Sequence, residues 1–103
     1  MPNYTIDTYT IQLEAGPTTG RRAMMICRQS GTVRGWVVFY DDTATLPDPS
    51  LDATSRITLP YPLSRYASVV DLFRNEKPLT LYYNSPSFAG ITVGGEPVGE
   101  EES

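Results

Sequence analysis

Residues 64–93 decide the fold, and they read SRYASVVDLFRNEKPLTLYYNSPSFAGITV. The first part predicts one amphipathic helix over residues 64–76, because its apolar residues recur at the spacing of a single helical face. That stripe consists of Tyr66, Val69, Val70 and Phe73. Ser64 suits the N-cap, Asn75 suits a left-handed C-cap, and Pro78 stops the segment. A helix this short is not stable alone in water, so we expect it to pack across a sheet.

The second part of the same stretch predicts a hairpin. Apolar and polar residues alternate in LTLYYN and again in FAGITV, and SPS between them forms the turn. Gly90 in the return strand suggests a β-bulge.

Upstream of the helix the chain reads as strands separated by turns. The predicted segments are a bulged strand at 3–14, strands at 21–29 and 34–41, a long loop at 42–55, and a short edge strand at 56–59 that ends at Pro60. The strand at 21–29 is apolar on both faces, which suggests a cover on each side. The sequence therefore predicts an α+β fold: a small curled antiparallel sheet or partly open barrel of five to six strands with one helix. OB-type barrels share this meander–helix–hairpin order, an analogy of topology alone.

Length and charge indicate one domain with a tail. At 103 residues the chain is long enough for a single core, which we place in residues 1–94. Residues 95–103 hold four of the twelve acidic residues and few apolar ones, so we expect a disordered acidic tail. Without that tail the positive and negative charges balance, although the net charge of the chain is −4.

The expected location is the cytoplasm. No apolar run reaches the length of a membrane span, and the first residues lack the pattern of a signal peptide. Cys27 is the single cysteine, so an intrachain disulfide is impossible. We expect no membrane association.

The residue inventory argues against an enzyme. The chain has no histidine, which removes the commonest general base and metal ligand. Cys27 lies mid-strand and reads as a small buried hydrophobe, and Lys77 is the single lysine. We expect no cofactor and no catalytic residue. The aspartate loop, Asp41–Asp52, gives a third alternative, a metal or small-molecule site, although its spacing matches no calcium-binding loop.

An arginine-rich hairpin supports a second hypothesis, single-stranded nucleic-acid binding. Its candidate residues are Arg21, Arg22, Arg28, Arg34, Trp36 and Tyr40. On an OB-like sheet the arginines would contact the backbone and the aromatics would stack on bases. The lack of an excess of basic residues argues against nucleic-acid binding. The arginines can instead pair with the aspartates of the next loop. Trp36 and Tyr40 can equally belong to the core beneath the helix.

The preferred hypothesis rests on the tyrosines. Seven tyrosines are more than one small core can bury, and tyrosine is favoured at protein interfaces. The candidate interface residues are Tyr4, Tyr9, Tyr82 and Tyr83, on strands that can pair edge to edge. The sequence thus predicts a non-catalytic protein-interaction module that self-associates, with a homodimer or another protein as partner.

Overall fold

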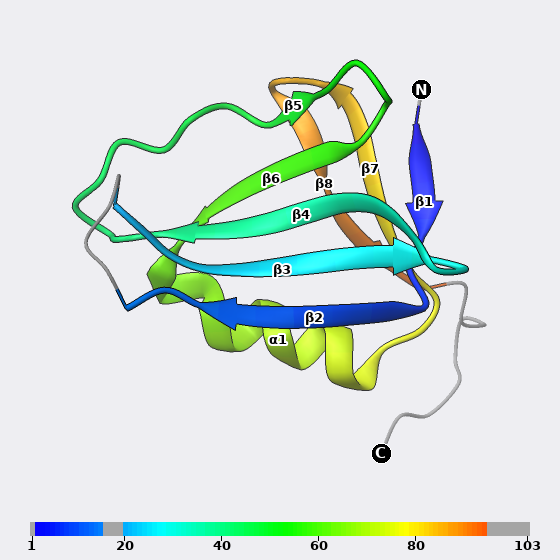
Figure 1. The fold of residues 1–103 in the computed structure, drawn as a ribbon, viewed down its shortest axis with the longest axis horizontal. Coiled ribbons are helices and arrows are strands. Elements are labelled where there is room, and N and C mark those ends of the chain that lie inside the picture. The colour runs from blue at the N-terminus through cyan, green and yellow to red at the C-terminus, as the bar shows by residue number, and fades with distance from the viewer. Residues whose placement is uncertain (1, 16–19, 95–103) are drawn as a thin grey trace.

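A computed structural model describes residues 2–15 and 20–94 and confirms the α+β fold, with eight short strands and a single α-helix (Figure 1). The strands are β1 (Asn3–Thr5), β2 (Thr8–Leu13), β3 (Arg21–Gln29), β4 (Thr32–Tyr40), β5 (Ser50–Leu51), β6 (Ile57–Pro62), β7 (Leu79–Ser85) and β8 (Phe88–Val93). The helix is α1 (Tyr66–Asn75), preceded by a 3₁₀ turn at Leu63–Arg65. The predicted tail, 95–103, and residues 16–19 of the predicted turn lie outside the described residues.

The strands form two sheets that pack against each other. The larger sheet has the order β2-β3-β4-β6-β5, and the smaller has the order β1-β7-β8. All neighbours are antiparallel except β4 and β6. Neither sheet closes on itself, so the fold is an open sheet rather than a closed barrel.

One bend joins the two sheets. The Ile6 N–H donates to the Leu79 carbonyl at 2.9 Å, whereas the next N–H, of Asp7, donates to the Arg28 carbonyl at 3.0 Å. The chain therefore leaves β7 and joins β3 within two residues. The single bulged strand predicted at 3–14 was wrong in this respect, because the bend divides it between the sheets.

The strand before the helix also differs from its prediction. It runs from Ile57 to Pro62, lies inside the large sheet, and pairs in parallel with β4. Pro60 and Pro62 are tolerated because β5 covers only Ile57 and Thr58, so the prolines border an unpartnered edge of β6.

The hairpin between β3 and β4 is tighter than predicted. β3 has the expected bounds, and β4 begins at Thr32. Ser30 and Gly31 form the turn with φ values of 52° and 84°. Two successive positive φ angles suit the right-handed twist of a two-residue hairpin.

The helix ends differ from the predicted caps. The N-cap is Arg65 with no side-chain hydrogen bond, so Ser64 does not cap the helix. Asn75 remains helical, and its side-chain nitrogen donates to Asp71 Oδ1 at 2.7 Å and to the Asp71 carbonyl at 3.1 Å. The C-cap is Glu76 in an extended conformation.

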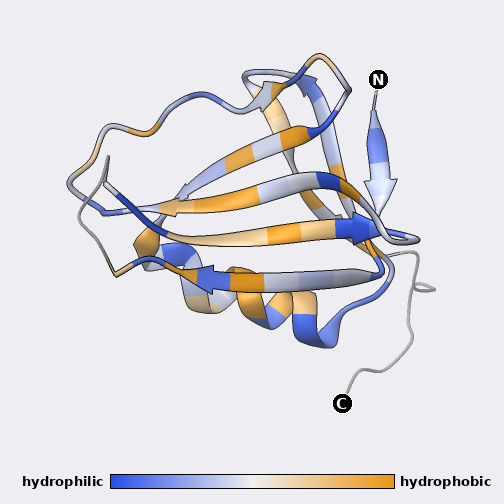
Figure 2. Ribbon diagram, viewed as in Figure 1, coloured by the Kyte–Doolittle hydropathy of each residue, from blue (hydrophilic) through white to orange (hydrophobic). Residues whose placement is uncertain are grey.

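The core lies between the two sheets and α1. The fully buried large side chains come from four strands: Phe39, Met25, Ile57, Leu59, Leu81 and Val37. The predicted helical stripe packs on this cluster, with Phe73 edge-on to Tyr9 at 5.2 Å and Tyr66 edge-on to Phe39 at 5.1 Å. Figure 2 shows hydrophobic segments along β3, β4 and β6 and on α1. Leu13 is the exception in β2, because it is 71% exposed at the end of the strand.

Candidate functional site

The four arginines of the predicted nucleic-acid site are engaged within the chain. Two form ion pairs, Arg21 with Glu14 at 3.4 Å and Arg22 with Asp41 at 3.2 Å. Arg28 donates to the Thr10 hydroxyl at 2.8 Å, and Arg34 donates to the Gln29 side chain at 3.2 Å. Arg34 also lies 4.8 Å from the centre of the Tyr4 ring. A ligand phosphate would have to compete with these contacts.

Trp36 lies on the face of the large sheet that is turned away from the helix. It sits between Ile26 and Thr58, its register partners on β3 and β6, and is half-buried. The Arg56 guanidinium lies 5.0 Å from the centre of the Trp36 ring. Tyr40 pairs with Arg21 at the far end of the strand. Among the described residues, no helix or strand covers this outer face, although the apolar pattern of β3 suggested a cover on both sides.

Three of the four candidate interface tyrosines pack against the core. Tyr4, Tyr9 and Tyr83 are partly buried against it. Tyr82 instead lies on the outer face of the small sheet, where its ring is 5.6 Å from that of Phe88 and covers Gly90. The predicted bulge at Gly90 is absent from the β7–β8 pairing, which is irregular between Tyr83 and Ser85. Gly90 pairs directly with Tyr82, an aromatic residue that shields a glycine in the neighbouring strand.

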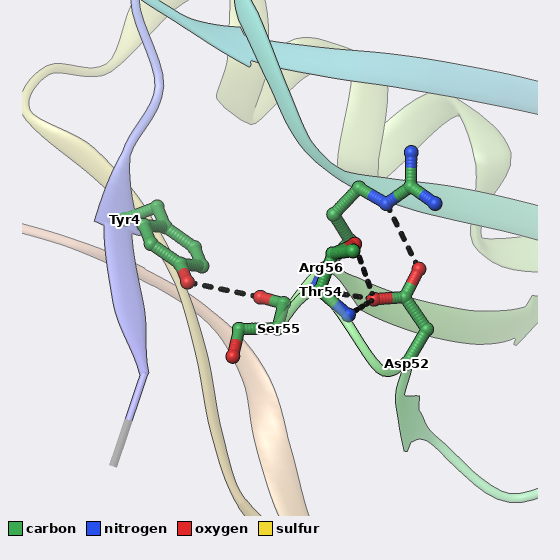
Figure 3. A network of polar contacts seen from close by, with 5 residues as sticks. All are labelled: Tyr4, Asp52, Thr54, Ser55 and Arg56. Carbon is green, nitrogen blue, oxygen red and sulfur yellow. Dashed lines mark hydrogen bonds and ion pairs between the residues drawn. The ribbon is translucent and has the colours of Figure 1, made fainter.

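The turn before β6 is held by one carboxylate. Asp52 accepts hydrogen bonds from the Thr54 and Arg56 N–H groups, both at 2.9 Å, and from the Arg56 Nε at 2.9 Å (Figure 3). These bonds, that from the Arg56 N–H above all, lower the pKa of Asp52 to about 2. Tyr4 joins β1 to this turn, because its hydroxyl donates to the Ser55 carbonyl at 2.9 Å.

The other end of the aspartate loop is organised in a similar way. The Asp41 carboxylate accepts the Thr43 N–H at 3.1 Å, and this bond is the main reason why the pKa of Asp41 is lowered. Asp42 accepts the Ser64 N–H at 3.0 Å, which anchors the loop to the start of the helical segment. In the described part of the chain, no group of three or more His, Cys, Asp or Glu side chains is placed to hold a metal ion.

Cys27 is fully buried at the centre of β3. Burial raises the pKa of its thiol to about 12, and the nearby Arg28 offsets only part of this effect. The thiol is therefore protonated at neutral pH and shielded from solvent, the surroundings of a structural rather than a reactive cysteine.

A hollow of about 660 Å³ lies between the β1–β2 bend and the end of α1. Its apolar lining includes Ile6 and Phe73, and its charged lining residues carry both signs: Asp7, Arg74, Glu76 and Lys77. The mixed charges select no class of ligand.

The free edge of β8 is the clearest binding feature. Ile6 and Pro2 bond to Leu79 and Tyr83, so the odd-numbered residues of β7 face β1. The Gly94 N–H donates to the Pro78 carbonyl at 3.3 Å, so the even-numbered residues of β7 face β8. By the alternation of an antiparallel ladder, Gly90 and Thr92 bond to β7. The N–H and C=O groups of the remaining residues therefore point away from the sheet, and these residues are Ala89, Ile91 and Val93.

The side chains along this edge leave it unprotected. β8 contains neither a charged residue nor a proline, the usual means by which edge strands avoid pairing. Phe88 is 56% exposed beside a shallow hollow of about 450 Å³ on the outer face of the small sheet. Within residues 2–15 and 20–94, β7 is the one strand that pairs with β8. The sequence shows that the segment of β8 is uncharged, but it does not show that this strand lies at the edge of a sheet.

Comparison with protein-family models, curated proteins and solved structures found no match. In the described segments, no helix is long and apolar enough to cross a membrane.

Proposed function

We propose that the chain is a non-catalytic protein-interaction module whose binding surface is the free edge of β8. The observation that supports it most directly is the outward row of backbone groups at Ala89, Ile91 and Val93. An added strand would satisfy these groups and extend the small sheet, which is how strand addition gives affinity. β8 has no charged residue and no proline, the residues that usually oppose the pairing of an edge strand with another strand.

Phe88 supports the same proposal. It is one of the few large apolar side chains that remain mostly exposed, and it lies at the end of the unpaired edge. Aromatic residues are enriched in the buried centre of protein interfaces. Side chains of an incoming strand would lie beside Phe88 at this edge.

The test is binding of a strand peptide. A labelled peptide with the sequence FAGITV, flanked by lysines for solubility, is titrated with the protein and followed by fluorescence anisotropy. We expect saturable binding that Ala89→Pro abolishes, because proline removes the outward N–H and its ring obstructs the edge. Leu13→Pro, at the free edge of β2, is the matched control and should bind normally. Equal binding by the two variants, or none by the wild type, would reject the edge of β8.

A second candidate is single-stranded nucleic-acid binding by the outer face of the large sheet. It is favoured by one observation, the half-buried Trp36 with Arg56 over its ring, on a face that no helix or strand of the described residues covers. Binding would require oligonucleotide bases to replace Arg56 on the indole. Titration of oligonucleotides should then quench Trp36 emission, less strongly as salt rises. Unchanged emission and anisotropy at low salt would contradict this function.

A further inference from the structure

We propose that the strand added to β8 is the β8 of a second copy, in an antiparallel pair centred on Ile91. This inference rests on the proposed function, because it names the partner of the same edge. It specifies a two-fold symmetric dimer in which the small sheets of two copies join into one continuous sheet.

The backbone selects the register. In an antiparallel pair, two residues that both point outward exchange two hydrogen bonds. Centring on Ile91 pairs Ile91 with its own copy and Ala89 with Val93 of the second copy, so all three outward residues are used on both strands. A shift by one residue on one strand would pair outward groups with inward ones. A shift by two would place either Ala89 or Val93 opposite a residue outside β8.

The side chains fit the same register. Phe88 falls opposite Gly94 of the second copy, and no atom of the described residues lies within 4 Å of the position of a Gly94 Cβ. Gly90, already covered by Tyr82, falls opposite Thr92 of the second copy. No charged side chain on β8 meets its equivalent across the axis, so like charges do not oppose the pairing. The edge is therefore complementary to itself, as an isologous interface requires.

Hydrogen exchange of single amides tests the register. Amide exchange is measured by NMR at micromolar and near-millimolar protein, with the mass followed by sedimentation velocity. We expect a dimer at high concentration and a fall of at least tenfold in the exchange rates of Ala89, Ile91 and Val93. The Thr92 amide, bonded to β7 in both states, should change much less. Protection of only two of the three outward amides would show a shifted register and overturn the pairing centred on Ile91.

Two variants separate this inference from the proposed function. Ala89→Pro should be monomeric, and Leu13→Pro should remain dimeric. Should Ala89→Pro fail to fold, Thr92→Lys places a charge on the edge while it leaves the backbone donors intact, and it should weaken the dimer at least tenfold. A wild-type monomer that still binds the FAGITV peptide would overturn the dimer but keep strand addition. A dimer with unprotected β8 amides, unaffected by Ala89→Pro, would overturn the β8 dimer, and a wild type that also fails to bind the peptide would overturn strand addition as well.

Discussion

Gly35 shows how one residue sets the distance between two strands. A Cβ at Gly35 would lie 2.5 Å from the Ile57 carbonyl oxygen and 3.0 Å from a methyl group of Leu81. Glycine thus permits the parallel approach of β6 to β4 and the packing of β7 beneath them.

Gly35→Ala should therefore destabilise the protein by about 1–3 kcal/mol, because the Ile57 backbone must move to admit the methyl group. Urea denaturation measures the loss, and the Leu81 methyl resonances should shift. In the comparison variant Gly31→Ala, no heavy atom lies within 4 Å of the added Cβ, so those resonances should stay in place, although the positive φ of 84° makes this substitution destabilising as well. A Gly35→Ala protein as stable as the wild type would mean that the two strands are farther apart.

Cys27 provides a second prediction at the scale of one residue. Its pKa of about 12 means that the native thiol should not react with Ellman's reagent at about pH 8, whereas the unfolded chain should react at once. Stability should also fall as the pH rises from about 8.5 towards 12, because only the unfolded chain then loses the thiol proton. Cys27→Ala should reduce that alkaline slope. Rapid labelling of the native protein would contradict the burial of Cys27.

At the scale of the element, α1 packs on the sheets through Val69 and through two aromatic contacts, Phe73 with Tyr9 and Tyr66 with Phe39. Phe73 is half-buried against Tyr9, so Phe73→Ala should cost about 2 kcal/mol, below the 3–5 kcal/mol typical of a fully buried phenylalanine. Denaturant unfolding measures the loss. The control Arg74→Ala, on the exposed side of the helix, should change the free energy of unfolding by less than about 0.5 kcal/mol. Equal effects of the two substitutions would show that the helix is held elsewhere.

The turn at residues 52–56 should respond to acid. Because its hydrogen bonds lower the pKa of Asp52 to about 2, the Asp52 carboxyl resonance should titrate there rather than near 3.9, the ordinary value for aspartate. The ionised Asp52 carboxylate stabilises the folded protein above about pH 4, and this contribution is lost as the pH falls through about 2. Thr54→Val removes the hydroxyl group that donates to Asp52, so it should raise the titration midpoint of the Asp52 carboxyl. A wild-type midpoint at the ordinary value would contradict the turn geometry.

The same elements show what the sequence could predict. The alternation in β7 and the stripe in α1 follow from local apolar periodicity, and the structure confirms them. The β4–β6 pair could not be predicted, because Pro60 and Pro62 argue against a strand and parallel pairing depends on contacts distant in sequence. The sequence identified the candidate arginines, but the residues that they contact depend on the register of strand pairing and could not be predicted. The position of β8 at the edge of the small sheet could not be predicted for the same reason, because it depends on which strands pair with β8.

At the scale of the whole molecule, the β1–β2 bend is one of two covalent links between the sheets, the other being the α1 segment between β6 and β7, and the bend also forms hydrogen bonds to both sheets. Consecutive residues, Ile6 and Asp7, bond to opposite sheets, and the Tyr4 hydroxyl ties β1 to the turn at Ser55. The two sheets also share one core, in which Leu81 of the small sheet and Val37 of the large sheet are both fully buried. Opening either sheet would expose that core, so we expect the two sheets to unfold as one unit.

Native-state hydrogen exchange tests this coupling. In the wild type the protected amides of β3 and β7 should open with the same free energy, equal to that of global unfolding. Ile6→Pro removes the donor to Leu79 and should lower the opening free energy of β7 amides by more than about 1 kcal/mol relative to β3 amides. Thr5→Ala, at an exposed neighbouring position, should leave the two sheets coupled. Independent opening of the small sheet in the wild type would show that the bend does not carry the coupling. The edge of β8 would then belong to a unit that unfolds separately.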